Sequence, residues 1–278
     1  MPPNFLTLTP SIELPLYAKR IIITAPRNYA LRLYREIVQQ GGLPLLMPTI
    51  ETCLLTDNTE LDRVLHKIEE FDWIVFTSRN GIEAFLERMR VLGLSLSVLE
   101  SCFVCAIGKD TDKLTDLGIK VNLVPREPSP AGIIAELANF AEDIRGKSIL
   151  VPAPEVMDVP EPDIIPNFVC ELQQLDMKVT RVPTYTTRCL DGTIYEVELE
   201  LIRQGKIDAI AFSSTAEIES FLNMIDSSDD LQQTLVACFG PYTATNAKKL
   251  GLDVAIVAED YSSFEGFAEA IAAFWATS

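Results

Sequence analysis

Two stretches of the sequence decide the fold: FDWIVFTSRNG at residues 71–81 and IDAIAFSSTAE at residues 207–217. Each is a short apolar run with an acidic residue in second place, followed by hydroxyl side chains and then by a pattern typical of a helix. A short apolar strand that leads directly into a helix is the unit from which parallel α/β sheets are built. We therefore expect an α/β fold in which this unit occurs more than once.

The rest of the chain repeats this alternation. Strand-like runs such as RIIITAP (20–26), CFVCAIG (102–108), VNLVP (121–125) and LVACFG (235–240) each precede an amphipathic helix. The pattern predicts parallel sheets covered by helices on both faces. The stretch at 151–166 contains five prolines, and we expect an ordered loop there, with little helix or sheet before the next helix begins.

The two opening stretches belong to a longer internal repeat. Alignment of FDWIVFTSRNGIEAFL with IDAIAFSSTAEIESFL makes seven positions coincide: Asp72/Asp208, Ile74/Ile210, Phe76/Phe212, Ser78/Ser214, Ile82/Ile218, Glu83/Glu219 and Phe85/Phe221. Further along, Gly108 and Thr111 correspond to Gly240 and Thr243 at equal spacing. A chain of 278 residues is long enough for two domains. We infer that one α/β unit has been duplicated.

The composition is that of an ordinary globular protein with an acidic surface. Apolar residues make up 48% of the chain and charged residues 23%, and no apolar stretch is long enough to span a membrane as a helix. The net charge of −17 argues against a nucleic-acid partner, because phosphate binding needs a basic surface. The N-terminal residues lack the basic and apolar regions of a secretion signal, so we expect a cytoplasmic protein with no membrane partner.

The cysteine and histidine content limits the possible chemistry. Cys102 and Cys105 form a CxxC motif within a predicted strand, where this spacing directs the two side chains to opposite faces. Buried free thiols are therefore favoured over a redox or zinc site. The single histidine, His66, falls off the apolar stripe of its predicted helix and is expected in solvent. A catalytic triad with histidine and a metal site with several histidines are both disfavoured.

Ligand chemistry is expected at the carboxyl ends of the strands, where open parallel sheets bind their ligands. The residues that leave these ends are 24–27, 77–80, 108–111, 152–155, 213–215, 240–243 and 262–263. Most combine Ser, Thr or Gly with the free N–H groups of a helix start, which favours anionic ligand groups. Helix capping alone explains any single turn. Several such turns in two similar domains facing a shared cleft predict a ligand with many carboxylates.

Two further observations bear on the ligand. Neither GxGxxG nor GxxxxGK[ST] occurs, so no dinucleotide or nucleotide triphosphate is indicated. In the alignment of MPTIET (47–52) with VPTYTT (182–187), Tyr185 stands where the first copy has Ile50. A strand tyrosine can serve simply by packing its ring. Alternatively, its phenol is a neutral hydrogen-bond donor near pH 7.

Five stretches, in this order, closely resemble the uroporphyrinogen-III synthase family: FTSRNGIEAF, IGKDTDKLTDLGIKV, TRVPTYTT, AFSSTAEIESF and FGPYTATNAKKLGL. The long proline-bearing loop and the PRNYA start look most like the cyanobacterial branch of this family. The resemblance implies two similar flavodoxin-like parallel-sheet domains joined by a two-stranded β-ladder. It also implies that domain 1 is discontinuous, with residues 1–47 plus 186–278 on either side of domain 2 at 48–185. The linker strands are expected near 47–52 and 181–187. The repeat alone would instead divide the chain near Gly146.

The resemblance also implies an activity. Members of the family are lyases that close hydroxymethylbilane, a linear tetrapyrrole with eight carboxylates, to uroporphyrinogen III with loss of water and inversion of ring D. This reaction belongs to haem and chlorophyll biosynthesis and needs no metal or organic cofactor. The expected partner is thus a small-molecule substrate, and the expected state is a monomer. A substrate with eight carboxylates agrees with the many predicted helix starts, whose free N–H groups favour anionic ligand groups.

The resemblance assigns roles to particular residues. A tyrosine on the linker strand assists the loss of the hydroxyl group in the family, and Tyr185 matches it. The residues that match the substrate-binding turns or lie beside them are Arg27, Ser78, Arg79, Lys109, Thr111, Ser214, Thr215, Gly240, Thr243, Ser262 and Ser263. Two positions depart from the family pattern. Many bacterial members of the family have the tripeptide TRP after the first strand, whereas here Thr24 is followed by Ala, Pro and then Arg27. The ESSxPT-like turn near the C-terminus reads EDYSS (259–263).

A function of another class stays open at this point. Two similar α/β lobes joined by two strands also build binding proteins that close on a ligand without chemistry. The alternative is therefore a non-catalytic, two-lobed cytoplasmic binding or sensor protein for a polycarboxylate. Supplying hydroxymethylbilane and separating the porphyrin isomers formed would distinguish the two.

Overall fold

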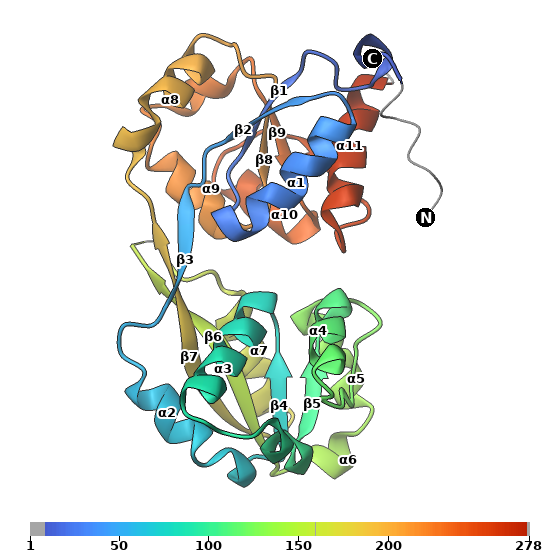
Figure 1. Cartoon of the computed structure of the whole chain (residues 1–278), viewed down its shortest axis with the longest axis vertical. Coiled ribbons are helices and arrows are strands. Elements are labelled where there is room, and N and C mark those ends of the chain that lie inside the picture. The colour runs from blue at the N-terminus through green and yellow to red at the C-terminus, as the bar shows by residue number, and fades with distance from the viewer. Residues whose placement is uncertain (1–8, 159, 277–278) are drawn as a thin grey trace. The chain divides into compact units, whose positions relative to one another are not determined.

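The computed structural model describes residues 9–158 and 160–276. The chain divides into two compact units: unit 1 comprises Met1–Glu51 and Arg188–Ser278, and unit 2 comprises Thr52–Thr187 (Figure 1). The chain crosses from one unit to the other in β3 (Ile50–Leu54) and returns in β7 (Lys178–Cys189), and these two strands are neighbours in one sheet. Each unit is built around its own five-stranded sheet.

Unit 1 is a parallel sheet with helices on both faces. Its main elements are β1 (Arg20–Ile23), α1 (Arg27–Gln39), β2 (Leu43–Leu46), α8 (Glu196–Arg203), β8 (Ala209–Phe212), α9 (Thr215–Leu222), β9 (Leu235–Cys238), α10 (Pro241–Lys249), β10 (Val254–Val257) and α11 (Phe264–Ala276). The strand order is β10-β9-β8-β1-β2, and every neighbouring pair is parallel. Counted within the unit, this is the 2-1-3-4-5 order of flavodoxin-like folds.

The core of unit 1 lies on both faces of its sheet because successive strand residues point in opposite directions. Ile21 and Ile23 of β1 pack into the layer under α1 and α11, which lie side by side (Figure 1). Ile22, between them, packs into the opposite layer under α8, α9 and α10. The apolar runs in the sequence are therefore continuous because both faces of the strand are covered.

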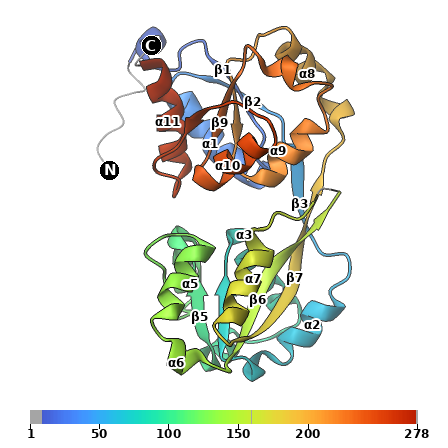
Figure 2. The same ribbon diagram turned by 180° about the vertical axis from the view of Figure 1, so that it is seen from behind.

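The strands of unit 2 lie in the same spatial order, but the chain begins at a different strand of that order. Its main elements are α2 (Thr59–Leu65), β4 (Trp73–Phe76), α3 (Arg79–Val91), β5 (Phe103–Ala106), α4 (Thr111–Asp116), α5 (Pro130–Ala138), α6 (Ala141–Ile144), β6 (Ser148–Met157), α7 (Ile164–Gln174) and the connecting strands β3 and β7 (Figure 2). The sheet order is β3-β7-β6-β4-β5. If β6 is counted first, β7-β6-β4-β5 again begins 2-1-3-4. The two similar flavodoxin-like sheets predicted from the sequence are confirmed.

The fifth position of that order in unit 2 is weakly formed. The predicted strand at 121–125 is reduced to one parallel bridge between Cys105 and Leu123. Val104 N–H donates to Oδ1 of Asn122, and Asn122 N–H donates back to Val104 O. The side chain of Asn122 thus takes a place that a second backbone group would hold in a regular ladder.

The prediction of a loop at 151–166 is wrong. Strand β6 runs through Pro152 and Pro154 to Met157, and α7 begins at Ile164. The two prolines are tolerated because β4 is paired with β6 only as far as Leu150. Their spacing of two residues turns both nitrogens to the same side, so the missing N–H groups fall where the ladder has ended. Pro166 lies in the first turn of α7, where a helix also needs no N–H donor.

The internal repeat is visible in matching contacts. Phe76 packs edge-to-face on Phe85 with ring centroids 5.3 Å apart, and Phe212 packs in the same way on Phe221 at 5.4 Å. At the other end of each strand, an aspartate binds the start of the neighbouring strand. Asp72 accepts from Lys147 Nζ and Ser148 N, and Asp208 accepts from Lys19 Nζ and Arg20 N. The two copies therefore share their core and the edge at which their strands begin.

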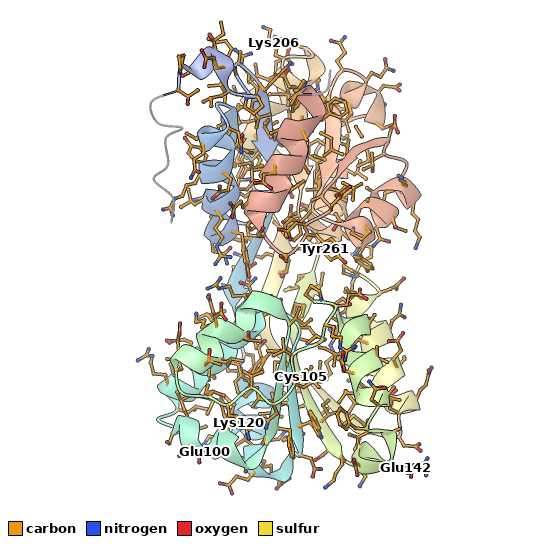
Figure 3. All side chains as sticks on the ribbon, turned by 90° about the vertical axis from the view of Figure 1, so that its right-hand side faces the viewer. Glu100, Cys105, Lys120, Glu142, Lys206 and Tyr261 are labelled. Carbon is orange, nitrogen blue, oxygen red and sulfur yellow. The ribbon has the colours of Figure 1, made fainter. Side chains whose placement is uncertain are left out.

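The cysteines and the histidine lie largely as expected. Cys102 and Cys105 are buried free thiols in separate cores on opposite faces of the unit 2 sheet. Figure 3 labels Cys105 inside this unit, and burial raises the pKa of its thiol to about 12. The other thiols are also free, although Cys170 is exposed. His66 is exposed, with Nδ1 2.7 Å from Asp62 O. Within residues 9–158 and 160–276, none of the helices combines the length and the hydrophobicity needed to cross a membrane.

Candidate functional site

In each sheet the order of the strands reverses at one position, and there the helices that leave two neighbouring strands pass to opposite faces. In unit 1 this switch point lies between β1 and β8, because α1 packs on one face and α9 on the other. In unit 2 it lies between β6 and β4, followed by α7 and α3. Sheets of this kind bind ligands outside the carboxyl ends of the strands at the switch point. The residues there are the first candidates for a site.

A tyrosine occupies the switch point of unit 2. The hydroxyl of Tyr185 lies 3.2 Å from Ser78 Oγ, and the same oxygen of Ser78 caps α3 by accepting from Gly81 N at 3.1 Å. A Cβ atom on Gly81 would lie 3.3 Å from Ser78 Oγ, 3.7 Å from Pro152 O and 4.0 Å from Cε1 of Tyr185. The absence of a side chain at residue 81 therefore leaves the space in which the ring and the capping serine meet.

The phenol of Tyr185 is neutral and deeply placed. The side chain is 7% exposed. Burial raises the pKa of the phenol above its ordinary value, and the hydrogen bond with Ser78 offsets only part of this effect. A neutral phenol keeps a proton that it can donate in a hydrogen bond. The sequence left two roles open for this residue, and the structure shows a polar contact at a switch point in addition to ring packing.

A glutamate occupies the switch point of unit 1. The carboxyl group of Glu217 is fully buried, and four groups converge on it. Oε2 lies 2.8 Å from both Thr24 Oγ1 and Ser213 N, whereas Oε1 is bonded to the hydroxyls of Ser213 and Ser214. Burial raises the pKa of Glu217, and these hydrogen bonds offset part of the rise. The carboxyl thus joins the end of β1 to the turn after β8.

The serines predicted at the helix starts are helix caps. Ser78 caps α3, and Ser214 caps α9 by accepting from Glu217 N at 3.4 Å. Thr215 follows directly, is 7% exposed, and accepts a hydrogen bond from Asn246 Nδ2. The local sequence favours this outcome because serine at a helix start satisfies a free N–H group. Capping does not use the first N–H groups of each helix, which still point out of the helix end.

The glycine and threonine turns differ between the two units. Gly108 has a left-handed backbone with φ of 54°, and Thr111 Oγ1 donates to its carbonyl oxygen at 2.8 Å. Gly240 caps α10 with an extended backbone, and Thr243 is buried within that helix. The two threonines therefore hold the same position in the repeat, but their local contacts differ. Lys109 lies on the short turn Gly108–Asp110, but its side chain is outside the described part of the structure.

The predicted arginines begin helices at the carboxyl edges of the two sheets. Arg27 is the first residue of α1 and is exposed. Arg79 is the first residue of α3, and its Nε donates to Glu83 Oε1 at 3.2 Å. Lys113 binds the same carboxylate oxygen at 2.7 Å. Arg79 is thus already held in place, whereas the guanidinium of Arg27 acts electrostatically on the hydroxyl of Tyr195.

Ser262 and Ser263 are engaged with a carboxylate. Ser262 Oγ donates to Asp260 Oδ1 at 2.6 Å, and Ser263 Oγ donates to Asp260 Oδ2 at 2.9 Å. Ser263 also accepts from Gly266 N, as Ser129 accepts from Gly132 N in the other copy. A substrate carboxylate at this turn would meet the charge of Asp260, so these two serines are the weakest of the predicted binding residues.

Two residues of unit 1 were missed by reasoning from the sequence. Glu217 stands three residues after the cap in Ser-Thr-Ala-Glu, which is the capping-box pattern and could have drawn attention to it. In a standard box the glutamate accepts from the backbone N–H of the cap residue, whereas here it accepts from the backbone N–H of Ser213, one residue earlier, and also contacts Thr24. No motif in the sequence pointed to Tyr195. Its buried hydroxyl and Oε2 of Glu219 have no hydrogen-bond partner within residues 9–158 and 160–276.

Two of the cavities in the described part of the chain lie at the opposite ends of the strands from the switch points. One, of about 670 Å³, is lined by residues around Phe103 at the start of β5, and the other, of about 630 Å³, by residues around Leu235 at the start of β9. They occupy the same place in the two copies, at the amino ends of the strands, so the repeated fold accounts for both. Among the described residues, no group of three or more His, Cys, Asp and Glu side chains is arranged to hold a metal.

Comparison with known proteins identifies the family. The family model described as uroporphyrinogen-III synthase HemD matches residues 32–267. The chain belongs to the uroporphyrinogen-III synthase family. It is therefore an enzyme of a porphyrin-biosynthesis family, and the alternative of a non-catalytic binding protein is not supported.

Individual members of the family agree with this assignment. A uroporphyrinogen-III synthase of the cyanobacterium Synechococcus elongatus is 26% identical over 259 residues, covering 90% of this chain and 93% of the relative. The porphyrin biosynthesis protein HemD of Ruminiclostridium josui is 26% identical over 242 residues, covering 86% of this chain. The chain spans only 45% of the length of that second protein.

The fold is also that of solved family members. A mutant uroporphyrinogen III synthase from Thermus thermophilus superimposes with a TM-score of 0.64 at 18% identity, covering 91% of this chain and 98% of the other. An identity this low shows the shared fold alone. The roles of the residues at the switch points must therefore be argued from their own chemistry.

Proposed function

We propose that this enzyme closes hydroxymethylbilane to uroporphyrinogen III, with loss of water and inversion of ring D, and that Tyr185 is its catalytic residue. The single observation that carries the proposal is the neutral, buried phenol of Tyr185, held by Ser78 at the carboxyl edge of the unit 2 sheet. This group can donate a hydrogen bond to a departing hydroxyl without first needing a proton from solvent.

The proposed reaction requires few catalytic groups of the protein, because the substrate itself drives most of the steps. The electron-rich pyrrole next to the hydroxymethyl group expels the hydroxyl, which leaves as water and gives an azafulvene. The substituted carbon of the terminal ring attacks this group to form a spiro intermediate, which fragments and closes again with ring D inverted. The protein has to hold the chain of four pyrroles in a curled conformation and to assist the leaving group.

The turns at the helix starts are proposed to bind the acetate and propionate groups. The supporting features are the capped N-termini of α3 and α9 at Ser78 and Ser214, with the positive ends of the helix dipoles beside them. Thr215, Gly240 and Thr243 belong to the same edge of the unit 1 sheet. Exposed Arg27 adds a full positive charge, and we include Arg79, Lys109 and Thr111 as their counterparts in unit 2.

An isomer assay tests the proposed function. Hydroxymethylbilane is generated in place and incubated with the protein, the product is oxidised, and the porphyrin isomers are separated. We expect mainly uroporphyrin III. Uroporphyrin I is the product of spontaneous closure, so its exclusive formation would reject the proposed reaction whatever the affinity of the protein for the substrate.

We also propose that the enzyme acts as a cytoplasmic monomer. All six thiols are free, as is usual in a reducing compartment. Both copies of the duplicated unit already lie in one chain, so the fold does not need a second chain to supply a second copy. Size-exclusion chromatography with light scattering tests the monomer, and fractionation of the source cells tests the compartment.

A further inference from the structure

The buried carboxyl of Glu217 raises a question of proton placement. Thr24 Oγ1 carries one hydroxyl proton but lies 2.9 Å from Ala211 O and 2.8 Å from Glu217 Oε2. The carbonyl oxygen of Ala211 can only accept a hydrogen bond. If the proton of Thr24 goes to this carbonyl, the short contact with Oε2 needs a proton from Glu217. A neutral carboxylic acid therefore satisfies both contacts of Thr24, and an ionised carboxylate satisfies only one.

The remaining contacts are compatible with the neutral acid. Ser213 N–H and the hydroxyls of Ser213 and Ser214 supply hydrogen bonds to the two carboxyl oxygens. Cys238 lies on the adjacent strand β9. Burial, and to a smaller extent the nearby carboxyl of Glu217, raise the pKa of the Cys238 thiol to about 12. The thiol is uncharged at neutral pH, so it adds no charge beside Glu217. A buried anion without a cationic partner is unfavourable.

We propose that Glu217 is a positioning residue for substrate binding, which ties the turn Ser213–Ser214 to the end of β1 as a neutral acid and so keeps the N-terminus of α9 available to a substrate carboxylate. This inference rests on the proposed function. The reason is electrostatic: an ionised Glu217 beside the first turn of α9 would repel an incoming carboxylate, whereas a neutral acid fixes the turn and leaves the helix dipole unopposed.

The position in the fold supports this role. Thr24 follows β1 and Ser213 follows β8, so Glu217 joins the two strands that flank the switch point of unit 1. The backbone of α9 is held from a second side, where Thr49 Oγ1 donates to Glu217 O and Ser220 Oγ donates to Thr49 O. A loss of the carboxyl would release the turn while this second attachment keeps the helix in place.

The test compares Glu217→Gln with Glu217→Ala. The amide introduced by Glu217→Gln is uncharged like the proposed acid. Its oxygen can accept from Ser213 N and its NH₂ group can donate to the two serine hydroxyls, so only the hydrogen bond to Thr24 is lost. We expect Glu217→Gln to keep the KM for hydroxymethylbilane within about threefold of the wild-type value. Glu217→Ala should raise KM roughly tenfold and change kcat less than about threefold. The substitution weakens substrate binding but leaves the groups that take part in the chemical step in place.

Matched variants separate positioning from folding. Ser213→Ala removes one hydroxyl from the carboxyl and should raise KM about threefold, which keeps the test open if Glu217→Ala does not fold. Thr234→Val is the control: Thr234 is buried and donates to Ile207 O at the other edge of the sheet, so its loss should lower the melting temperature and leave KM unchanged. An unchanged KM in Glu217→Ala and Ser213→Ala would overturn the proposal.

The protonation state is measured without any substrate. The infrared difference spectrum between the wild type and Glu217→Gln at neutral pH should contain the carbonyl band of a protonated carboxylic acid. A carboxylate band in its place would overturn the proposal even if the enzyme makes uroporphyrinogen III. Conversely, exclusive formation of the type I isomer by the wild type would reject the proposed function and leave the acid band unaffected, so the two failures are distinguishable.

Discussion

Gly81 and Glu217 occupy the same position of the repeat, three residues after the serine that caps a helix, and they have opposite effects. Gly81 leaves a space in which the ring of Tyr185 meets Ser78. Glu217 fills the corresponding space in unit 1 with a carboxyl that bonds to Thr24 and the neighbouring serines. Around both positions the strand, the cap and the edge-to-face phenylalanine pair are alike.

The difference shows how a duplicated fold can become specialised. The residues that build the sheet and its helices are shared between the copies, because each copy must bury the same kind of strand between two helix layers. The residues at the switch points are not under this packing constraint, so they are able to diverge. In our proposal, unit 2 supplies the phenol for the leaving group and unit 1 supplies a fixed helix N-terminus for a carboxylate.

The largest expected effect comes from removing the phenol. Tyr185→Phe should lower kcat roughly 100-fold, as is usual for the loss of a group that assists proton transfer, with KM changed little. Steady-state kinetics with isomer analysis measures both values. Tyr34→Phe, which removes a hydroxyl from a more exposed tyrosine on α1, is the matched control and should behave as the wild type. A wild-type kcat in Tyr185→Phe would remove this residue from the mechanism.

A smaller effect is expected from filling the space at residue 81. The Cβ atom alone already reaches 3.3 Å from Ser78 Oγ, so the methyl groups of Gly81→Val must displace the serine or the ring of Tyr185. We expect kcat to fall about tenfold, because small misplacements of a catalytic group are costly. Gly81→Ala should lower kcat only about two- to threefold. Equal activities of the two variants and the wild type would show that the space is not needed.

The unit 1 position predicts a pH dependence of stability. Burial raises the pKa of Glu217 in the folded state above its ordinary value of 4.5, so its contribution is fully present below that pH. The contribution falls as the pH rises and is lost once the pH passes the folded-state pKa, with a slope of about 1.4 kcal/mol per pH unit inside this window. Urea unfolding of the wild type and Glu217→Gln at several pH values measures it. A constant difference between the two would contradict the prediction.

The smallest effect is expected where the copies are alike. Asp72→Asn and Asp208→Asn each weaken the link between an aspartate and the start of the neighbouring strand. Because the side chains are partly exposed, each substitution should lower the free energy of unfolding by only about 1 kcal/mol, with kcat and KM unchanged. Chemical denaturation measures the stability of both variants, and steady-state kinetics measures their activity. A much larger cost in one copy than in the other would show that the shared edge is also specialised.

Much of the fold could be predicted from the sequence because strands and helices of this class have local signals. The apolar run before Ser78 and the cap itself predicted β4 and α3, and the same pattern predicted β8 and α9. The errors fell where a local rule competes with tertiary pairing. Prolines argued for a loop at 151–166, but β6 continues through them, past Leu150, where its pairing with β4 ends.

The candidate site was less predictable. The sequence singled out Tyr185, but the contact with Ser78 joins residues 107 positions apart and could not be read from spacing. The partners of Glu217 illustrate the same limit, because Thr24 lies 193 positions away along the chain. A hydrogen bond between such residues depends on the angle and register with which two strands meet, and no local pattern encodes these.

The sequence by itself determined the α/β class, the duplication and the family, because hydrophobic periodicity, helix caps and repeated motifs are local properties of the chain. Only the tertiary structure decided what each copy does with residue 81 or 217. The same turn holds a phenol in unit 2 and a buried acid in unit 1, since the space beside a switch point is shaped by strands that are distant in sequence and adjacent in the sheet.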